Sequence, residues 1–172
     1  MVAQVLAHDL LAELPERWRH TVGVAARADA MNRAVAPHDV ETVLVAAWLH
    51  DIGYSPSAVD TGFHPLDGAR YLSAHGWPAR ICSLVAHHSA AVLMASERGL
   101  GAAMREFPIE ISAVADVLTL ADQTVGPNGE PMTLDERLAE RQTRTGRDGR
   151  DAREQSFRAV ERRVSDLLGV RT

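Results

Sequence analysis

The sequence predicts an all-α fold, a compact helical bundle that forms a single domain. Apolar residues recur along nearly the whole chain at the spacing of an amphipathic helix. Runs of alternating apolar and polar residues bounded by hairpin turns, which indicate β-strands, are missing. The chain has 172 residues, of which 46% are hydrophobic, and this suits one domain with a sizeable core.

Three helices are expected in the first part of the chain. Residues 2–13 are predicted to form a short amphipathic helix. Pro15 suits the first turn of a long helix that runs to about Val35, where Pro37 prevents its continuation. The next helix is expected over residues 38–51, because its apolar residues are spaced for burial on one face.

Glycine and proline residues delimit the helices that follow. After a loop, Pro65 suits the start of a helix that Gly76 terminates. Further helices are expected over residues 78–89, over 90–104 with a break around Gly99 and Gly101, and over 109–122.

The last part of the chain is predicted to be a charged helical extension. Residues 126–131 form a turn-rich loop, and residues 134–163 are helical with a break at 146–149. The domain, residues 1–172, then consists of a core at about 15–123 and an extension, 124–172, that packs on it. The expected contacts of the last helix with the core are Phe157, Val160, Val164 and Leu167.

Composition limits the classes of partner and the compartment. The net charge is −5 and every basic residue is an arginine, several of them interleaved with acidic residues near the C-terminus, so no nucleic-acid partner is expected. The single cysteine, Cys82, cannot form an internal disulfide. The sequence shows neither a signal peptide nor an apolar run long enough to span a membrane. We therefore expect a cytoplasmic protein without a membrane partner, and its oligomeric state is left open.

Ionisable residues that stand within or at the ends of apolar helices are the main functional signal. An unpaired imidazole or carboxylate is costly to bury in such a position, and a shared metal ion would remove that cost. The residues in question are His20, the doublet His50–Asp51, the pair His87–His88, and Asp122.

These side chains suit a divalent transition metal such as Mn, Fe, Co, Ni or Zn. His50 and Asp51 can turn toward one point only at a helix terminus, which is where the pattern places them. Helices carrying His20 and Asp122 could converge there, while His64 and His87 could hold a second ion bridged through Asp51. Two ions would polarise phosphoryl oxygens and generate hydroxide near neutral pH.

The order and helical context of these residues resemble the HD superfamily of metal-dependent phosphohydrolases. The resemblance covers Arg17 to about Asp122. Its motifs are RW..H, which ends at His20, LHDIG, which contains the doublet, H...GA..L, which starts at His64, and the HH pair. It implies an all-α fold, a metal held by His20, His50, Asp51 and Asp122, and hydrolysis of a phosphate ester or anhydride.

Comparison with branches of the superfamily bears on the number of ions. The two-metal members imply that His64 and His87 hold the second ion. No GYP follows the HH pair, which argues against the HD-GYP cyclic-dinucleotide phosphodiesterases. The glutamate that the single-metal 5′-nucleotidase branch carries after the doublet is also missing, since Ile52 and Gly53 stand there. Two ions are therefore expected.

Simpler interpretations stand beside each assignment. His20 and Asp122 could be hydrogen-bonded core residues, and His64 could lie beside a helix cap in a loop. Of the HH pair, we favour His87 as the ligand and His88 as a substrate-facing or surface residue. His8–Asp9, His38 and His75 are expected at the surface, and the three tryptophans in or near the core.

Arg17, which lies one turn before His20, could grip a substrate phosphate with its planar fork of N–H groups, or could pair with a nearby acid.

The expected function is hydrolysis of a small phosphorylated substrate, a nucleotide or a related compound. In this hypothesis Asp51 positions a metal-bound hydroxide, and Arg17 stabilises the developing charge with the ions. One alternative is a mixed-valent di-iron oxygenase of the same superfamily. Another is a non-catalytic HD module that senses a ligand or binds a partner.

Overall fold

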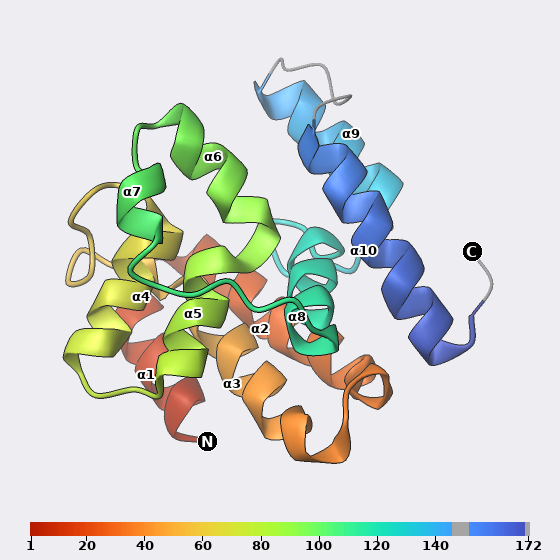
Figure 1. The fold of residues 1–172 in the computed structure, drawn as a ribbon, viewed down its shortest axis with the longest axis horizontal. Coiled ribbons are helices and arrows are strands. Elements are labelled where there is room, and N and C mark those ends of the chain that lie inside the picture. Colours follow the sequence, from red (N-terminus) through yellow and green to blue (C-terminus); the bar gives the residue numbers. More distant parts are fainter. Residues whose placement is uncertain (146–151, 171–172) are drawn as a thin grey trace.

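The protein is all-α, as the sequence predicts. The computed structural model describes residues 1–145 and 152–170, which contain an isolated bridge between Val125 and Pro131 but no β-strand. Figure 1 shows the arrangement of the helices. They are α1 (Val2–Leu11), α2 (Pro15–Ala30), α3 (Val40–Leu49), α4 (His64–Ala74), α5 (Ala79–His87), α6 (Ala91–Glu97), α7 (Gly101–Met104), α8 (Ala113–Gln123), α9 (Leu134–Thr145) and α10 (Ala152–Leu168).

Several helices are shorter than predicted, because short 3₁₀ turns replace their ends. The helix that starts at Pro15 stops at Ala30 instead of Val35, and a 3₁₀ turn, η1 (Asn32–Ala34), follows it. A second turn, η2 (Pro37–Asp39), precedes α3. Two more, η3 (Ile52–Tyr54) and η4 (His88–Ala90), follow α3 and α5.

Glycines and one serine mark other boundaries. Gly76 and Gly99 adopt positive φ angles of 75° and 72°, as expected at helix ends. The helix predicted from residue 109 begins only at Ala113, because the Ser112 side chain caps its first turn by accepting a hydrogen bond from Ala115 N at 3.2 Å. Ile111, just before this cap, is 97% exposed.

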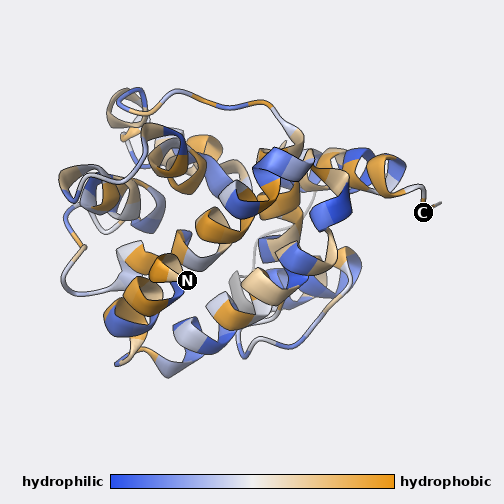
Figure 2. Ribbon diagram, turned by 90° about the horizontal axis from the view of Figure 1, so that it is seen from below, coloured by the Kyte–Doolittle hydropathy of each residue, from blue (hydrophilic) through white to orange (hydrophobic). Residues whose placement is uncertain are grey.

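Helix α3 lies in the middle of the bundle, where it contacts α1, α2, α5 and α8 (Figure 1). Its core face carries Val43, Ala46 and Ala47, all fully buried. Small alanine side chains let the neighbouring helices approach closely. Figure 2 shows hydrophobic residues on the inner faces of the helices and hydrophilic ones toward solvent. The end of α3, with the His50–Asp51 doublet, is therefore surrounded by packed helices.

A close contact between two glycines places α4 beside the doublet. A side chain at Gly53 in η3 would lie only 2.0 Å from the carbonyl oxygen of His64, and one at Gly68 would lie 3.1 Å from Gly53 N. The first turn of α4 thus lies directly on the backbone that follows α3. This contact fixes the position of His64.

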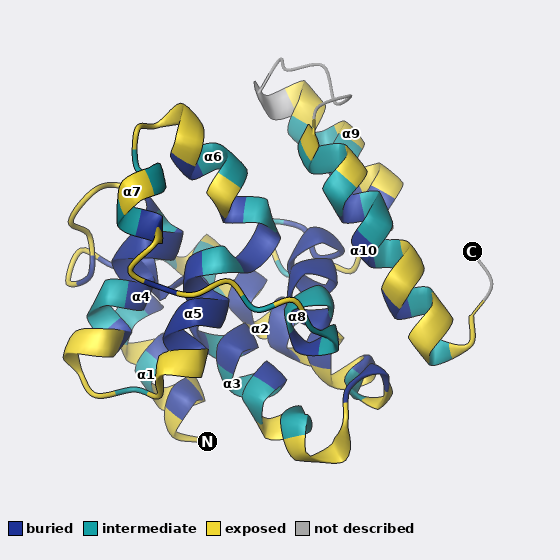
Figure 3. Ribbon diagram, viewed as in Figure 1, coloured by how far each residue is buried: buried dark blue, intermediate teal, exposed yellow. Residues whose placement is uncertain are grey.

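The C-terminal extension packs on the core through α10, which lies against α8. Phe157, Val160 and Val164 are buried, as predicted. The prediction that Leu167 packs on the core is wrong, because this residue is 53% exposed. Figure 3 shows this helix buried on one side and exposed on the other. The predicted break at 146–149 lies outside the described residues.

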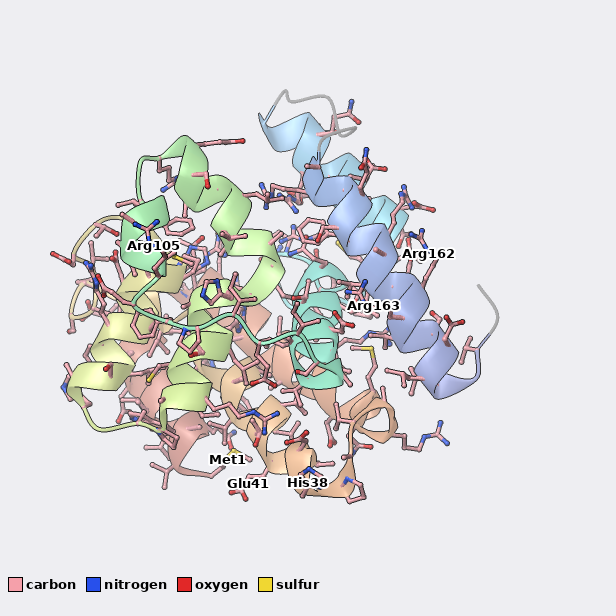
Figure 4. The ribbon with its side chains drawn as sticks, viewed as in Figure 1. Met1, His38, Glu41, Arg105, Arg162 and Arg163 are labelled. Atoms are coloured by element: carbon pink, nitrogen blue, oxygen red, sulfur yellow. The ribbon has the colours of Figure 1, made fainter. Side chains whose placement is uncertain are left out.

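Arginines on the extension pair with acidic residues, which fits a solvated helical face. Arg163, labelled in Figure 4, donates two hydrogen bonds of 2.7 Å to Asp116 on α8. Arg158 pairs with Asp135 at 2.8 Å and thereby joins α10 to α9. Among the described residues, no helix combines the length and apolar character that crossing a bilayer requires.

The loop after α8 is seated on α2 by two glycines. A side chain at Gly23 in α2 would lie 2.7 Å from Gly129 O and 2.7 Å from the Val125 side chain, and one at Gly129 would lie 2.4 Å from Arg19 O. The loop also carries Gly126, whose carbonyl oxygen accepts a hydrogen bond from His20.

We expect Gly23→Ala to lower the free energy of unfolding by about 1–3 kcal/mol, because the added methyl group overpacks the contact between α2 and this loop. Gly101→Ala is the matched control, since its methyl group would meet only Ser96 Oγ at 3.7 Å. Chemical denaturation followed by circular dichroism measures both. Equal stability of the two variants would contradict the packing argument.

Candidate metal centre

The HD doublet lies at the C-terminal end of α3, as predicted. His50 is the C-cap residue of the helix, and Asp51 follows in a non-helical conformation (φ −104°, ψ 4°). The Nδ1–H of His50 donates to Ala47 O at 2.8 Å, one turn back in the helix. The two side chains therefore turn into the same buried region, with Nε2 of His50 pointing inward.

His20 on α2 and Asp122 on α8 meet His50 there. Nε2 of His20 is 2.9 Å from Asp122 Oδ1, and Nε2 of His50 is 3.9 Å from the same oxygen. The other ring nitrogen of His20 donates to Gly126 O at 3.0 Å. These three residues present their ligand atoms close enough to share one metal ion. The structure thus brings together His20, His50 and Asp122 as expected.

A second group of potential ligands consists of Asp51, His64 and His88. Nε2 of His64 is 3.3 Å from Asp51 Oδ1 and 3.3 Å from Nε2 of His88. The Nδ1–H of His88 donates to Val85 O at 2.6 Å. Asp51 also lies 3.6 Å from His50 Nε2 and 3.9 Å from His20 Nε2, so its carboxylate stands between the two groups.

His87 is not part of either group, contrary to its predicted role as a ligand. Its Nε2–H donates to Phe107 O at 2.8 Å, on the segment that follows α7. His87 is the last residue of α5 and His88 is its C-cap with an extended ψ of 151°, so the backbone turns between them and the two side chains meet different partners. The structure places His88, which is 3% exposed, among the potential ligands and not at the surface, and it directs the ring of His87 toward Phe107 O.

The ring nitrogens test whether a cation fits the site. A carbonyl oxygen can only accept, so the bonds to Ala47 O, Val85 O and Gly126 O place the protons of three histidines on Nδ1. The Nε2 lone pairs of His20 and His50 then face carboxylate oxygens, and that of His88 faces Nε2 of His64. Within the described part of the chain, no hydrogen-bond partner reaches the buried Nε2 of His50. An inward lone pair without a donor, beside carboxylate oxygens, fits a metal ion.

Burial and the neighbouring charges set the pKa values of the histidines. Desolvation lowers the pKa of His64 to about 3 and also lowers the pKa of His50, so both rings are neutral near pH 7. Burial opposes protonation of His20 as well, but its hydrogen bond to Asp122 and the charges of Asp122 and Asp51 raise its pKa overall. The two carboxylates therefore make the space between His20 and Asp122 favourable for a positive charge, whether a proton or a cation.

The carboxylates stay ionised. Burial would raise the pKa values of Asp51 and Asp122, but the surrounding imidazoles outweigh it and hold both pKa values below the ordinary range. Two buried anions beside four histidines form a donor set of nitrogen and oxygen typical of first-row transition metals.

Arg17 lies at the accessible rim of the site. Its Nη1 donates to Asp51 Oδ2 at 3.3 Å, and its guanidinium carbon is 4.3 Å from the centre of the Tyr54 ring. The Tyr54 ring also stacks on His64 with 4.1 Å between centroids. The side chain of Arg17 is 37% exposed, so it can contact a ligand from solvent while it pairs with Asp51, which is a nearby acid of the kind expected from the sequence.

Two further residues complete the surroundings of Asp122 and were missed by sequence reasoning. The hydroxyl of Ser89 donates to Asp122 Oδ2, and Nε2 of Gln123 donates to the same oxygen at 2.8 Å. Ser89 and Ala90 adopt left-handed conformations (φ 54° and 56°), which cost about 1–2 kcal/mol each for residues with a side chain. The only sequence signal was a polar residue beside each ligand motif, in HHSA and ADQT.

The remaining histidines lie outside the site. His8, His38 and His75 are exposed, as expected. His8 packs edge-on against Trp18, which in turn stacks on Trp48 near the core.

Comparison with known proteins identifies the family. The HD domain family matches residues 17–126, which is more than half of the chain and contains every residue of both ligand groups. No curated protein and no solved structure matches the chain. The matched segment, the all-α fold and the doublet at the end of α3 agree with one another. The chain belongs to the HD domain family.

Proposed function

We propose that the protein is a metal-dependent phosphohydrolase that cleaves a phosphate ester or anhydride bond of a nucleotide or a related small molecule. The observation that carries this proposal is the set of inward imidazole nitrogens beside two ionised carboxylates, with that of His50 lacking any hydrogen-bond partner and with Arg17 at the rim. Membership of the HD domain family supports the same reaction class.

The donor set supports two ions. His20, His50 and Asp122 would hold one ion, and Asp51, His64 and His88 the other. Asp51 is suited to bridge them, because its two oxygens face different histidines. Such ions supply Lewis acidity toward a phosphoryl group and lower the pKa of water.

The protein contributes binding, orientation and exclusion of water. Arg17 offers a planar fork of N–H donors, of which the bond to Asp51 engages one, and the others suit phosphate oxygens. Contacts with Asp51 and Tyr54 hold this guanidinium in place before a substrate arrives. Burial of Asp51, His50 and Asp122 removes competing solvent, which strengthens electrostatic interactions at the reacting group.

The same donor set favours one competing function. Four histidines and two aspartates would also suit a mixed-valent di-iron oxygenase of this superfamily. The two proposals differ in their need for a cation at the rim, since phosphate binding uses Arg17 and oxygen activation does not.

We expect the protein loaded with Mn or Co to release phosphate from nucleotides or an aryl phosphate without consuming oxygen. Removal of the metal by a chelator should abolish release, and readdition should restore it. Phosphate assays and an oxygen electrode measure the two reactions in parallel. Oxygen uptake by the iron-loaded form, without phosphate release with any divalent metal, would favour the oxygenase. Absence of both reactions would favour a non-catalytic module.

Replacing Arg17 by Ala should raise the KM for phosphate substrates by about tenfold or more, the cost of losing a charge-assisted hydrogen bond. Arg19→Ala is the matched control, because Arg19 lies on the same helix but donates to Asn128 at the surface. Metal content is measured in both variants. An unchanged KM in Arg17→Ala with full metal content would refute a role in phosphate binding.

Variants of His87 and His88 test which of these neighbouring histidines holds the second ion. We expect His88→Ala to lose one of two ions and His87→Ala to keep both, because only His88 points at Asp51 and His64. Elemental analysis after dialysis against buffered metal gives the stoichiometry. The reverse result would restore His87 as the ligand.

A further inference from the structure

A buried hydrogen-bond network joins Asp122 to the C-terminal extension. Gln123, which ends α8, donates from Nε2 to Asp122 Oδ2 at 2.8 Å and to Ser89 Oγ at 3.0 Å. Its Oε1 accepts from Nη1 of Arg141 on α9 at 2.7 Å. Three of these four residues are buried, and Arg141 is partly buried.

Arg141 determines which way the Gln123 amide faces. A guanidinium can only donate, so it requires the carbonyl oxygen of the amide on its own side. The NH₂ group of Gln123 is thereby turned toward the interior, where Asp122 Oδ2 and Ser89 Oγ accept from it. With the amide reversed, a carbonyl oxygen would face a carboxylate oxygen and two donors would face Arg141.

Ser89 is held in place from the opposite side. Its backbone N–H donates to Thr119 Oγ1 at 3.3 Å, and its hydroxyl donates to Asp122 Oδ2. The left-handed backbone at Ser89 and Ala90 aims this hydroxyl back at α8. A strained conformation persists only where its surroundings support it, and here one supporting contact goes to Thr119 and another to Oδ2 of Asp122, both on α8.

The network divides the two oxygens of Asp122 between two tasks. Oδ2 accepts from Ser89 and Gln123, whereas Oδ1 faces Nε2 of His20 at 2.9 Å and Nε2 of His50 at 3.9 Å. Rotation of the Asp122 carboxylate about its Cβ–Cγ bond would exchange the roles of the two oxygens. The donors on Oδ2 oppose that rotation.

We propose that Ser89, Gln123 and Arg141 are positioning residues that fix Asp122 as a ligand through Oδ1 alone, so that α9, which packs against α10, sets the affinity of the metal site. The inference rests on the metal site of the proposed function but not on the reaction it catalyses. Partners that orient a metal ligand typically change affinity by about 10–100-fold when removed.

Arg141→Met tests this inference, since it removes the donor to Gln123 while keeping an apolar stem over the Phe157 ring, which lies 5.4 Å from the Arg141 guanidinium carbon. We expect affinity for Co²⁺, measured by chelator competition on metal-free protein, to fall by about tenfold. The visible absorption of bound Co²⁺ should also shift, because it reports ligand geometry. Arg141→Lys should restore much of both, since an ammonium group can donate to Gln123.

Arg158→Met is the matched control. Arg158 joins α10 to α9 through Asp135 without contacting Gln123, so its loss perturbs the packing of the same two helices and should leave Co²⁺ affinity and absorption unchanged. Ser89→Ala and Gln123→Met should weaken binding by a similar or larger factor than Arg141→Met. Thermal unfolding of each metal-free variant establishes that it is folded, and if a buried variant is not, the part-exposed Arg141 variants decide.

Equal Co²⁺ affinity and identical spectra for Arg141→Met, Arg158→Met and the unaltered protein would overturn this inference while leaving the metal site intact. Equal weakening by Arg141→Met and Arg158→Met, without rescue by Arg141→Lys, would also overturn it, because a general loosening of α9 and α10 would then explain the effect. Failure of the unaltered protein to bind any divalent metal would instead refute the proposed function.

Discussion

Two aspartates buried in an apolar helical bundle impose the constraint that the surrounding structure satisfies. An ionised carboxylate without partners is very costly to place away from water. Asp51 and Asp122 are 3% and 8% exposed, and each is surrounded by imidazole rings. Arg17 adds a positive charge on Asp51, and Ser89 and Gln123 add donors on Asp122. Apart from those between sequence neighbours, these contacts each bring another segment of the chain to the same point.

Helix ends and backbone carbonyl groups give the site its rigidity. His50 and His88 each donate to a carbonyl oxygen three residues earlier, at the last turn of α3 and α5, and His20 donates to the loop that follows α8. Each of these rings is thus oriented by a backbone carbonyl group, not by a flexible side chain. Ligands held in this way need little rearrangement when a cation binds.

Sequence reasoning predicted the elements that local chemistry determines. Pro15 and Gly76 mark helix boundaries as expected, and the doublet lies at a helix end because apolar periodicity stops there. The sequence could not predict which of His87 and His88 faces the other ligands, because this depends on how far α5 continues before the chain turns. Ser89 and Gln123 were missed since their roles arise from contacts between α8, η4 and α9 that no local pattern encodes.

The bond between His20 and the carbonyl oxygen of Gly126 spans 106 positions of the sequence. Asp122, on the same distant segment, must also return to α2 before the ligand group with His20 and His50 exists. Closing so long a loop is slow relative to forming single helices, and long-range contacts of this kind form late in folding. During synthesis, this ligand group cannot assemble until the segment through Gly126 has left the ribosome. An ion held between His20 and Asp122 would thus mark a chain that is already folded through this segment.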